Sequence, residues 1–231
     1  MCFSVATWTG GYRMFGFFKR KPARQHEQAL ESQAADPIDR FWAWVLANRS
    51  GVVAEVQAFG TDGASSNLAV GELGDRLKRI DPGLAHEVGM ADPGTLEIVI
   101  SAEGFRKLFP TVLEVVKRAP DVSGLKVTAF RQRNPGMSLE VLAQTMTAED
   151  VSYVSQREGE KIGLDVFFDV DLDERARTMI GFLMLDMALG EYDVGTALGS
   201  IEFQEGRPPA DAKRLSELAE EVDAARTGMT H

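Results

Sequence analysis

The feature that most limits what this chain can fold into is a pair of strictly alternating segments, "TLEIVIS" from Thr95 and "GLDVFFDVD" from Gly163. Successive side chains of a β-strand point to opposite faces, so one apolar row at a period of two predicts a half-buried strand. The apolar rows are Leu96, Ile98 and Ile100 in the first segment and Leu164, Val166, Phe168 and Val170 in the second. Both segments therefore predict strands that pack one face against helices.

A helical pattern and another strand follow each alternating segment. The first helix is expected to start at Pro110 and to end before Pro120. The second is expected over Glu174–Leu189, with Asp173 as its N-cap and Gly190 after its C-terminus. The strands that follow are "LKVTAFRQR" and "GSIEFQ", and "VSYVSQ" is expected to form a hairpin with "GLDVFFDVD". This order favours an α+β fold, a ferredoxin-like βαββαβ antiparallel sheet with helices on one face.

Further helices are expected upstream. Asp36 and Pro37 mark a helix start, because aspartate is a good N-cap and proline is tolerated at the first helical position. This helix is expected to end at Gly51, and a second helix is expected over 68–80, before a strand over 84–90. The chain therefore predicts three parts: a flexible N-terminal tail over residues 1–35, a single α+β domain over residues 36–205, and an exposed C-terminal helix and tail over residues 206–231.

Charge and cysteine content exclude several classes of protein. The 231 residues carry a formal net charge of −10, which repels nucleic-acid phosphates, so nucleic-acid binding is not expected. Cys2 is the only cysteine, which excludes an intrachain disulfide and a thiolate metal cluster. No apolar run approaches the ~20 residues needed to span a bilayer. No integral membrane association is expected, and the cytoplasm is the default location.

One locally basic stretch lies close to the N-terminus. Lys19, Arg20, Lys21 and Arg24 follow the aromatic run at Phe15–Phe18. Such a segment can contact an anionic membrane surface or a nucleic acid weakly. We favour a flexible tail, because short charged segments at chain ends commonly remain unpacked.

The sequence motifs name no reaction. The acids of "DVDLD" at Asp169, Asp171 and Asp173 start like a calcium loop, but Glu174 and Ile180 stand where that loop needs glycine and a bidentate glutamate. The histidines are far apart in sequence, and no nucleophile elbow or phosphate-binding glycine loop is present. In "ISAEG" a tight turn is favoured over an anion site at a helix start. No metal and no cofactor is expected.

The face of the sheet opposite the apolar rows is expected to be acidic. It would carry Glu97, Asp165, Phe167, Asp169 and Glu202. Readers of single-stranded RNA stack bases on such a face but need cations around the aromatic rings. We therefore expect the upstream helices to cover part of this face through their Trp42 and Trp44 surface, since neighbouring tryptophans are seldom exposed. The alternative is contact with a basic partner.

The segment "LGEYDVG" places Glu191, Tyr192 and Asp193 directly after the helix that ends at Leu189. Acids at a helix C-terminus are disfavoured by the helix dipole, so they require a nearby cation, and Arg131 or Arg133 is expected to supply it. A structural ion pair is favoured over general acid–base catalysis. No catalytic residue is assigned, and the candidate ligand- or partner-binding residues are Arg131, Arg133, Glu191, Tyr192, Asp193, Trp42 and Trp44.

Several of these segments together resemble an uncharacterised family of bacterial proteins. They are "RFWAWV", "LEIVISAEG", "VVKRAPDVSGLKVTAFRQR" and "MALGEYDVGTALGSIEF", which extend from Arg40 to Phe203. The resemblance implies a bacterial origin and a common fold, and it transfers no catalytic residue. At the level of fold alone, the expected arrangement is also similar to small acidic ferredoxin-like regulators that bind and inhibit a ribonuclease.

Two hypotheses about function follow. The sequence favours a non-catalytic binding or regulatory module with an acidic surface and a protein partner. The alternative is a small-molecule enzyme of the hydrolase type, in which Glu191, Asp193, Arg131 and Arg133 line a pocket. The two hypotheses differ in geometry, because an active site requires those side chains to converge on a cavity.

Overall fold

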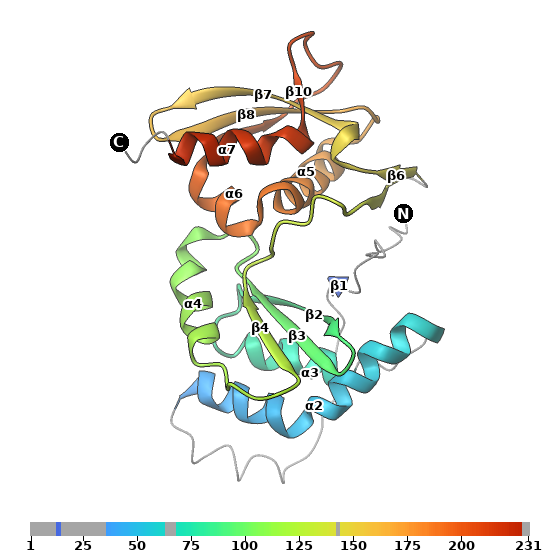
Figure 1. Cartoon of the computed structure of the whole chain (residues 1–231), viewed down its shortest axis with the longest axis vertical. Coiled ribbons are helices and arrows are strands. Elements are labelled where there is room, and N and C mark those ends of the chain that lie inside the picture. Colours follow the sequence, from blue (N-terminus) through green and yellow to red (C-terminus); the bar gives the residue numbers. More distant parts are fainter. Residues whose placement is uncertain (1–12, 15–35, 63–67, 142–143, 228–231) are drawn as a thin grey trace. The chain divides into compact units, whose positions relative to one another are not determined.

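The computed structural model describes residues 13–14, 36–62, 68–141 and 144–227 (Figure 1). The chain divides into two compact units. We call the described residues up to Ala129 the N-terminal unit, and the described residues from Phe130 onward the C-terminal unit. The single domain expected over residues 36–205 spans both units.

The N-terminal unit contains a mixed four-stranded sheet in the order β1-β2-β3-β4. Its strands are β1 (Arg13–Met14), β2 (Ala85–Asp92), β3 (Thr95–Ser101) and β4 (Leu125–Ala129). Its helices are α2 (Pro37–Asp62), α3 (Leu68–Leu77) and α4 (Phe109–Lys117). A 3₁₀ turn, η1 (Arg106–Leu108), directly precedes α4. The pair β2–β3 is antiparallel and the pair β3–β4 is parallel, so α4 is the crossover between parallel strands.

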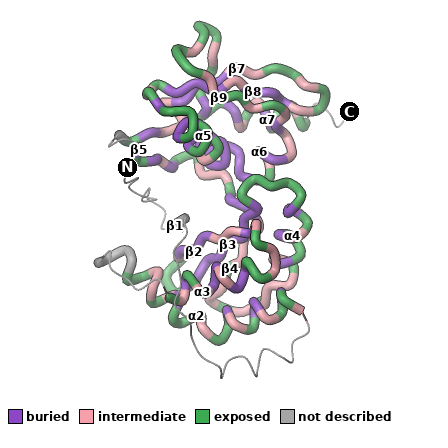
Figure 2. Tube along the Cα trace, turned by 180° about the vertical axis from the view of Figure 1, so that it is seen from behind, coloured by how far each residue is buried: buried purple, intermediate pink, exposed green. Residues whose placement is uncertain are grey.

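β3 forms the centre of this unit. The row Leu96, Ile98 and Ile100 is fully buried, as the alternation predicts. Glu97 and Val99 on the other face of β3 are also buried (Figure 2). A strand that is covered on both faces contributes more to the core than the half-exposed strand that its sequence pattern indicates.

Helix α2 begins as predicted but ends later. The Asp36 side chain accepts a hydrogen bond from the Ile38 amide at 2.8 Å, which caps the helix in front of Pro37. Gly51 does not end it, and α2 runs to Asp62. The physical reason is that Val52 is fully buried, so the apolar stripe continues past Gly51. The burial of this stripe outweighs the cost of a glycine in a helix, about 1 kcal/mol.

The C-terminal unit contains a second mixed sheet, in the order β10-β7-β8-β9, and a separate hairpin, β5-β6. Its strands are β5 (Leu139–Val141), β6 (Gln144–Met146), β7 (Val151–Glu158), β8 (Lys161–Phe168), β9 (Leu198–Phe203) and β10 (Lys213–Arg214). Its helices are α5 (Glu174–Leu189), α6 (Glu191–Ala197) and α7 (Leu218–Thr227), with 3₁₀ turns η2 (Ala148–Asp150) and η3 (Leu215–Glu217). The helices lie on one side of β7 and β8 in Figure 1.

The core of the C-terminal unit lies between β8 and its helices. Leu164 and Val166 are buried, as predicted, while Ile201 and Phe203 of β9 are half-buried. Gly181 of α5 allows the helix to approach the sheet, because a Cβ at this position would lie 2.1 Å from Cε1 of Phe203. Any larger residue at position 181 would have to displace that ring.

The ferredoxin-like sheet expected from the sequence is not confirmed, since its strands lie in two different mixed sheets. The coarser expectation holds, because the fold combines α-helices with β-sheets. In each unit the strand–helix–strand segment has an upstream hairpin partner of its own, β2 for β3 and β7 for β8. The order of elements along a chain is the same in both arrangements and does not specify which strands pair.

The C-terminal helix is half-buried, in contrast to the exposed helix expected over residues 206–231. Leu215, Leu218 and Val222 belong to the core of the C-terminal unit. The Tyr153 hydroxyl donates a hydrogen bond to Glu221 at 2.9 Å, and burial is the main cause that raises the pKa of this tyrosine. Helix α7 is therefore an integral part of its unit.

Most of the flexible tail expected over residues 1–35 lies outside the described residues, but Arg13–Met14 form β1 and pair with β2, so these two residues are part of a sheet. The residues that lie outside include the aromatic run at Phe15–Phe18 and the basic stretch Lys19–Arg24. Among the residues that the structure describes, no helix combines the length and the apolarity that crossing a bilayer requires.

Candidate functional site

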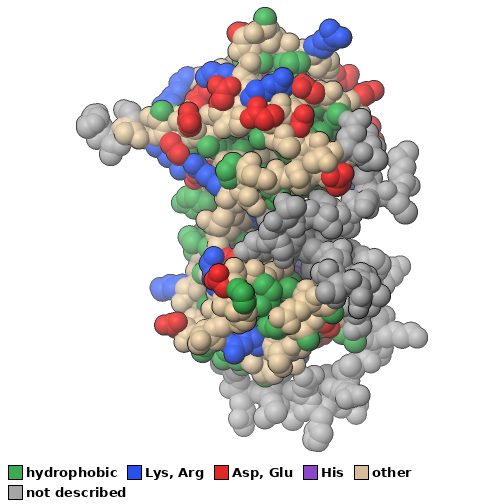
Figure 3. Space-filling view, turned by 45° about the vertical axis from the view of Figure 1, so that its right-hand side comes forward, with side chains coloured by type: hydrophobic (Ala, Val, Ile, Leu, Met, Phe, Trp, Pro, Cys, Tyr) green, Lys and Arg blue, Asp and Glu red, His purple; other side chains and the backbone are tan. Residues whose placement is uncertain are grey.

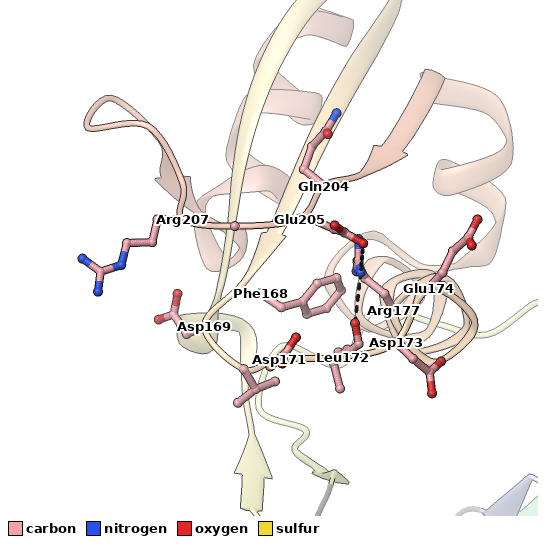
Figure 4. Close-up of a pocket in the computed structure, with 12 residues that line it drawn as sticks. Phe168, Asp169, Asp171, Leu172, Asp173, Glu174, Arg177, Gln204, Glu205 and Arg207 are labelled. Carbon is pink, nitrogen blue, oxygen red and sulfur yellow. Dashed lines mark hydrogen bonds and ion pairs between the residues drawn. The ribbon is translucent and has the colours of Figure 1, made fainter.

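The C-terminal unit is hollowed where β8 and β9 end. The groove has a volume of about 680 Å³ and is formed by the segment that follows β8, the start of α5 and the segment that follows β9 (Figure 4). Its charged side chains are Asp169, Asp171, Asp173, Glu174, Arg177, Glu205 and Arg207. β8 and β9 are parallel neighbours, and the carboxyl ends of parallel strands are where open sheets commonly bind ligands.

Acids dominate this groove. Five carboxylates face two arginines along its lining, which gives a formal net charge of −3. Asp169 forms an ion pair with Arg214 at 3.0 Å. The carboxylates of Asp171 and Glu174 are exposed, and neither has a hydrogen-bond or ion-pair partner in the part of the chain that the structure describes. These two side chains are therefore available to a cationic ligand.

Asp173 has a structural role at the edge of the groove. Its side chain accepts a hydrogen bond from the Ala176 amide at 2.8 Å, so it is the predicted N-cap of α5. Across the described ranges, no group of three or more His, Cys, Asp or Glu side chains is arranged to hold a metal ion. The groove is thus an acidic surface without the geometry of a calcium loop.

Arg177 is the buried cation of the groove. Only 8% of the residue is exposed. Its Nη2 donates to the Leu172 carbonyl at 3.0 Å and to Glu205 Oε1 at 2.9 Å (Figure 4). Its Nη1 donates to the Phe203 carbonyl at 3.4 Å. Because Leu172 follows β8 and Glu205 follows β9, this one side chain connects the two walls of the groove.

Among the residues selected from the sequence, Glu191, Tyr192 and Asp193 form the first turn of α6. This helix was not expected, and the acids lie at a helix start rather than at the C-terminus of α5. Their charges therefore interact favourably with the helix dipole. Gly190 separates the two helices with φ of 79°, and a Cβ there would approach the Arg131 carbonyl at 3.1 Å.

Arg133 is the cation that the sequence predicted beside these acids. Its guanidinium contacts Asp193 at 2.6 Å and Asp223 of α7 at 2.8 Å, and Asp193 also pairs with Arg226 at 2.7 Å. Its Nε donates to the Leu189 carbonyl at 2.9 Å. The hydrogen bond between Arg133 and Asp223 raises the pKa of the arginine and lowers the pKa of the aspartate. This network attaches α7 to the junction of α5 and α6.

Arg131 and Glu191 are buried beside this network. The Arg131 guanidinium contacts Asp186 at 3.3 Å, and its backbone amide donates to Glu191 Oε2 at 3.3 Å. The Glu191 amide donates to the Arg131 carbonyl at 2.9 Å. Tyr192 is 46% exposed, and its ring packs on that of Phe130 with 5.3 Å between the ring centroids. The four residues of the hydrolase hypothesis therefore do lie close together, but their contacts are with one another and with neighbouring structural residues. They are Arg131, Arg133, Glu191 and Asp193.

Trp42 and Trp44 belong to the N-terminal unit and serve its packing. Trp42 is buried, and its Nε1 donates to the Val115 carbonyl of α4 at 2.9 Å. The guanidinium of Arg76 lies over the ring of Trp44, 5.1 Å from its centroid. Trp42 therefore packs against a helix that contacts β3 and β4.

The acidic sheet face expected from the sequence is divided between the two units. Glu97 lies in the N-terminal unit, where it is buried and accepts a hydrogen bond from Thr128 Oγ1 at 2.6 Å. Asp165, Phe167, Asp169 and Glu202 lie in the C-terminal unit. Phe167 is 9% exposed, so it offers little area for stacking. Glu97 and the other four residues therefore belong to different units.

His86 is a core residue of the N-terminal unit. An added Cβ on Gly74 of α3 would lie 2.6 Å from His86 Cε1, so this glycine makes room for the ring. The Nε2 atom of His86 is buried, and no described residue forms a hydrogen bond with it. Burial, with a smaller effect of the Lys78 charge, lowers the pKa of His86 to about 4. The ring is therefore neutral near pH 7.

The sequence interpretation missed the groove itself. Asp169, Asp171 and Asp173 were assigned to a strand and a helix cap, and Arg177 and Glu205 were not considered. One signal was present, because Arg177 directly follows the buried Ala176 in α5. A charged residue at a core position of a helix requires a local partner. The spatial proximity of Glu205 had no signal in the sequence.

Comparisons with known proteins identify no relative of this chain. No protein-family model matches the chain, and neither a curated protein nor a solved structure matches it.

Proposed function

We propose that this chain is a non-catalytic binding or regulatory module of the bacterial cytoplasm, and that its partner is a protein that presents basic side chains to the acidic groove. One observation carries the proposal. The groove lies at the carboxyl ends of parallel strands, has a formal charge of −3, and holds two exposed carboxylates, Asp171 and Glu174, that have no partner among the described residues. A cationic side chain placed there gains favourable Coulomb energy and desolvates no existing ion pair of these two acids.

The charge distribution also favours a protein over a nucleic acid as the partner. The chain carries a formal net charge of −10, and on the face drawn in Figure 3 acidic side chains gather on the C-terminal unit, interspersed with lysine and arginine. Such a surface attracts basic protein segments and repels phosphates. The resemblance to an uncharacterised bacterial family is the basis for the proposed bacterial origin.

The hydrolase alternative is not favoured by a specific observation. Arg133 and Asp193 are committed to ion pairs, and Glu191 is buried against the Arg131 backbone. The convergence of these residues supports a structural role, which attaches α7 to the rest of its unit.

The proposal is tested by the binding of a fluorescent oligolysine peptide to the full chain, measured by anisotropy at low and high salt. We expect binding at low salt that weakens by about tenfold or more when salt is raised past physiological strength, because exposed charges are screened beyond about 8 Å. In the double variant Asp171→Asn/Glu174→Gln we expect a further loss of at least about fivefold at low salt, since both partner-free carboxylates become neutral.

The matched control removes the same number of charges away from the groove. Glu160 and Asp211 are exposed residues of the C-terminal unit and do not line the groove. The variant Glu160→Gln/Asp211→Asn should bind the peptide nearly as the unmodified chain does. Equal losses in both double variants would show that only net charge matters, and the groove would then not be the binding site.

A further inference from the structure

In the N-terminal unit, helix α3 packs on β2 through a histidine contact. A Cβ added to Gly74 of α3 would lie 2.6 Å from Cε1 and 3.2 Å from Nδ1 of His86, so the glycine lets the ring lie directly against the helix. The Val70 backbone of α3 forms a hydrogen bond with the same ring. The face of α3 that carries Gly74 also carries buried apolar side chains, which are Val70, Leu73 and Leu77. His86 thus adds a polar contact to a mainly apolar interface.

This interface has no place for a second proton on the ring. The Nε2 atom of His86 is buried, and no acceptor for it lies among the residues that the structure describes. A neutral imidazole carries a hydrogen on one nitrogen, whereas an imidazolium carries one on both. Protonation would therefore leave a charged donor in the interface without a described acceptor, which costs free energy. Burial, and then the Lys78 charge, lower the pKa of the ring for this reason.

The charged groups that the two helices bring near the ring do not compensate a positive charge there. From α3, Lys78 adds a charge of the same sign. From α2, the Glu55 carboxylate is turned to the start of α3, where it accepts hydrogen bonds from the Ala69 and Val70 amides at 2.9 and 3.1 Å. Glu55 therefore caps α3 and attaches it to α2.

The neighbouring strands bring no carboxylate to this side of the sheet. The residue of β3 opposite His86 is Ile100. Glu97 of β3 lies opposite Gly89, which is on the other face because successive residues of a strand alternate. Glu87 of β2 is on that other face too, and β1 pairs with it and with its neighbour Val88. A proton on the ring thus meets no opposite charge from the sheet.

We propose that α3 is a pH-sensitive element of the fold, which separates from β2 in mild acid while β3 and the C-terminal unit remain folded. A helix of 10 residues is marginal in water by itself, so α3 depends on its contacts with α2 and β2. β3 is paired on both sides, with β2 and with β4, and keeps these partners when α3 moves. Separation gives the charged ring access to water and uncovers the apolar face of α3. The chain then presents an apolar surface in acid that is covered near neutral pH.

The experiment is hydrogen exchange of the full chain at pH 7.5 and pH 5.0, resolved by peptide and corrected for the intrinsic effect of pH on exchange. The pKa of His86 is about 4 in the folded chain and about 6.5 once the ring is exposed. The equilibrium constant for opening of α3 should therefore be about 30-fold larger at pH 5.0 than at pH 7.5. Opening of β3 and α5 should change by less than about threefold. A similar increase in all three segments would mean that the whole chain loosens, and would overturn the proposal.

Substitution of the ring locates the effect. His86→Gln keeps a side-chain amide that can bond the Val70 backbone but cannot take up a proton, so the increase should fall to about threefold or less. The matched control is His231→Gln, at the last position of the sequence, which should leave the increase as it is. An increase that persists in His86→Gln would overturn the role of the ring.

Glu55→Gln separates the pH response from the strength of the attachment. Loss of the carboxylate charge at the start of α3 should raise the opening of the helix by about two- to fivefold at both pH values, and should leave their ratio unchanged. A ratio that falls as far as in His86→Gln would assign the response to Glu55 instead.

A measurement on the unmodified chain decides the matter if His86→Gln does not fold. The chain has three histidines, His26, His86 and His231. In nuclear magnetic resonance spectra of the chain labelled at histidine, one of the three signals should keep its neutral-state chemical shift down to about pH 5. Titration of all three signals near the ordinary pKa of about 6.5 would show that water reaches every ring near neutral pH, which is incompatible with the proposal.

Discussion

The two units are built on the same sequence of elements and differ where their parallel strands end. Each has a hairpin, a helical crossover and a strand parallel to the second hairpin strand. In the N-terminal unit, the turn after β3 is tight, with positive φ at Glu103 and Gly104. Ser101 Oγ accepts a hydrogen bond from the Glu103 amide in this turn, at 3.0 Å. In the C-terminal unit, residues 169–173 form a longer acidic segment beside the groove. The loop chemistry, and not the topology, gives the C-terminal unit its candidate site.

The units also differ in what their helical glycines make room for. Gly74 of α3 lies against His86, and Gly181 of α5 lies against Phe203. Both allow a helix to approach a sheet more closely than a Cβ would permit. The His86 ring can take up a proton, whereas the Phe203 ring cannot. We therefore expect the N-terminal unit to respond to mild acid differently from the C-terminal unit.

The largest expected effect is a loss of stability that is confined mainly to one of the two cores. Ile98 in β3 and Leu164 in β8 are buried at the centres of their sheets. Ile98→Ala and Leu164→Ala should each lower the free energy of unfolding by about 2–5 kcal/mol, through lost burial and a cavity. Hydrogen exchange resolved by peptide should show the loss of protection mainly in the unit that carries the substitution. Equal loss in both units from either substitution would contradict two separate cores.

The next effect is a pH dependence confined to the N-terminal unit. The pKa of His86 is about 4 in the folded chain and about 6.5 when unfolded, so the folded state favours the neutral ring. Stability from this group is fully present above about pH 6.5 and falls as pH is lowered toward 4, by about 3 kcal/mol in all. Urea unfolding between pH 7.5 and 4 measures it, and His86→Gln should flatten the curve in this window.

A comparison with the C-terminal unit sharpens this prediction. No histidine lies among the described residues of that unit. Two acids of that unit have lowered pKa values. A hydrogen bond from Ser200 lowers the pKa of Glu158, and one from Arg133 lowers the pKa of Asp223. Those acids lose their contribution only as the pH falls below about 4.5. If amides of the C-terminal unit lost protection between pH 6.5 and 5 as strongly as those of the N-terminal unit, His86 would not be the cause.

The smallest expected effect concerns the network that attaches α7. Arg133→Gln removes the ion pairs with Asp193 and Asp223, which are partly exposed, so we expect a loss of about 1 kcal/mol at low salt. The loss should shrink at high salt because the charges are screened. Urea unfolding at two salt concentrations measures it, and hydrogen exchange should show faster opening of α7. A loss independent of salt would indicate that packing, not charge, attaches the helix.

Much of the local structure could be predicted from the sequence. β3 has the bounds of the alternating segment at Thr95–Ser101, and α5 has the predicted bounds with Asp173 as its cap. Arg133 was identified as the cation beside Asp193. These features depend on neighbouring residues or on a strong electrostatic requirement. The extension of α2 past Gly51 and the short helix α6 were missed, because burial of Val52 and Glu191 overrides local breaking signals.

The sequence by itself determined the alternating strands, the capped helix α5, the acidic charge and the exclusion of a disulfide, because these follow from local periodicity, capping chemistry and composition. Only the tertiary structure decided that the strands divide into two sheets, that Trp42 packs on α4, and that Arg177 meets Glu205 in an acidic groove. The physical reason is that strand pairing and ion pairing join residues far apart in the chain, and their partners are selected by burial and geometry that no local pattern records.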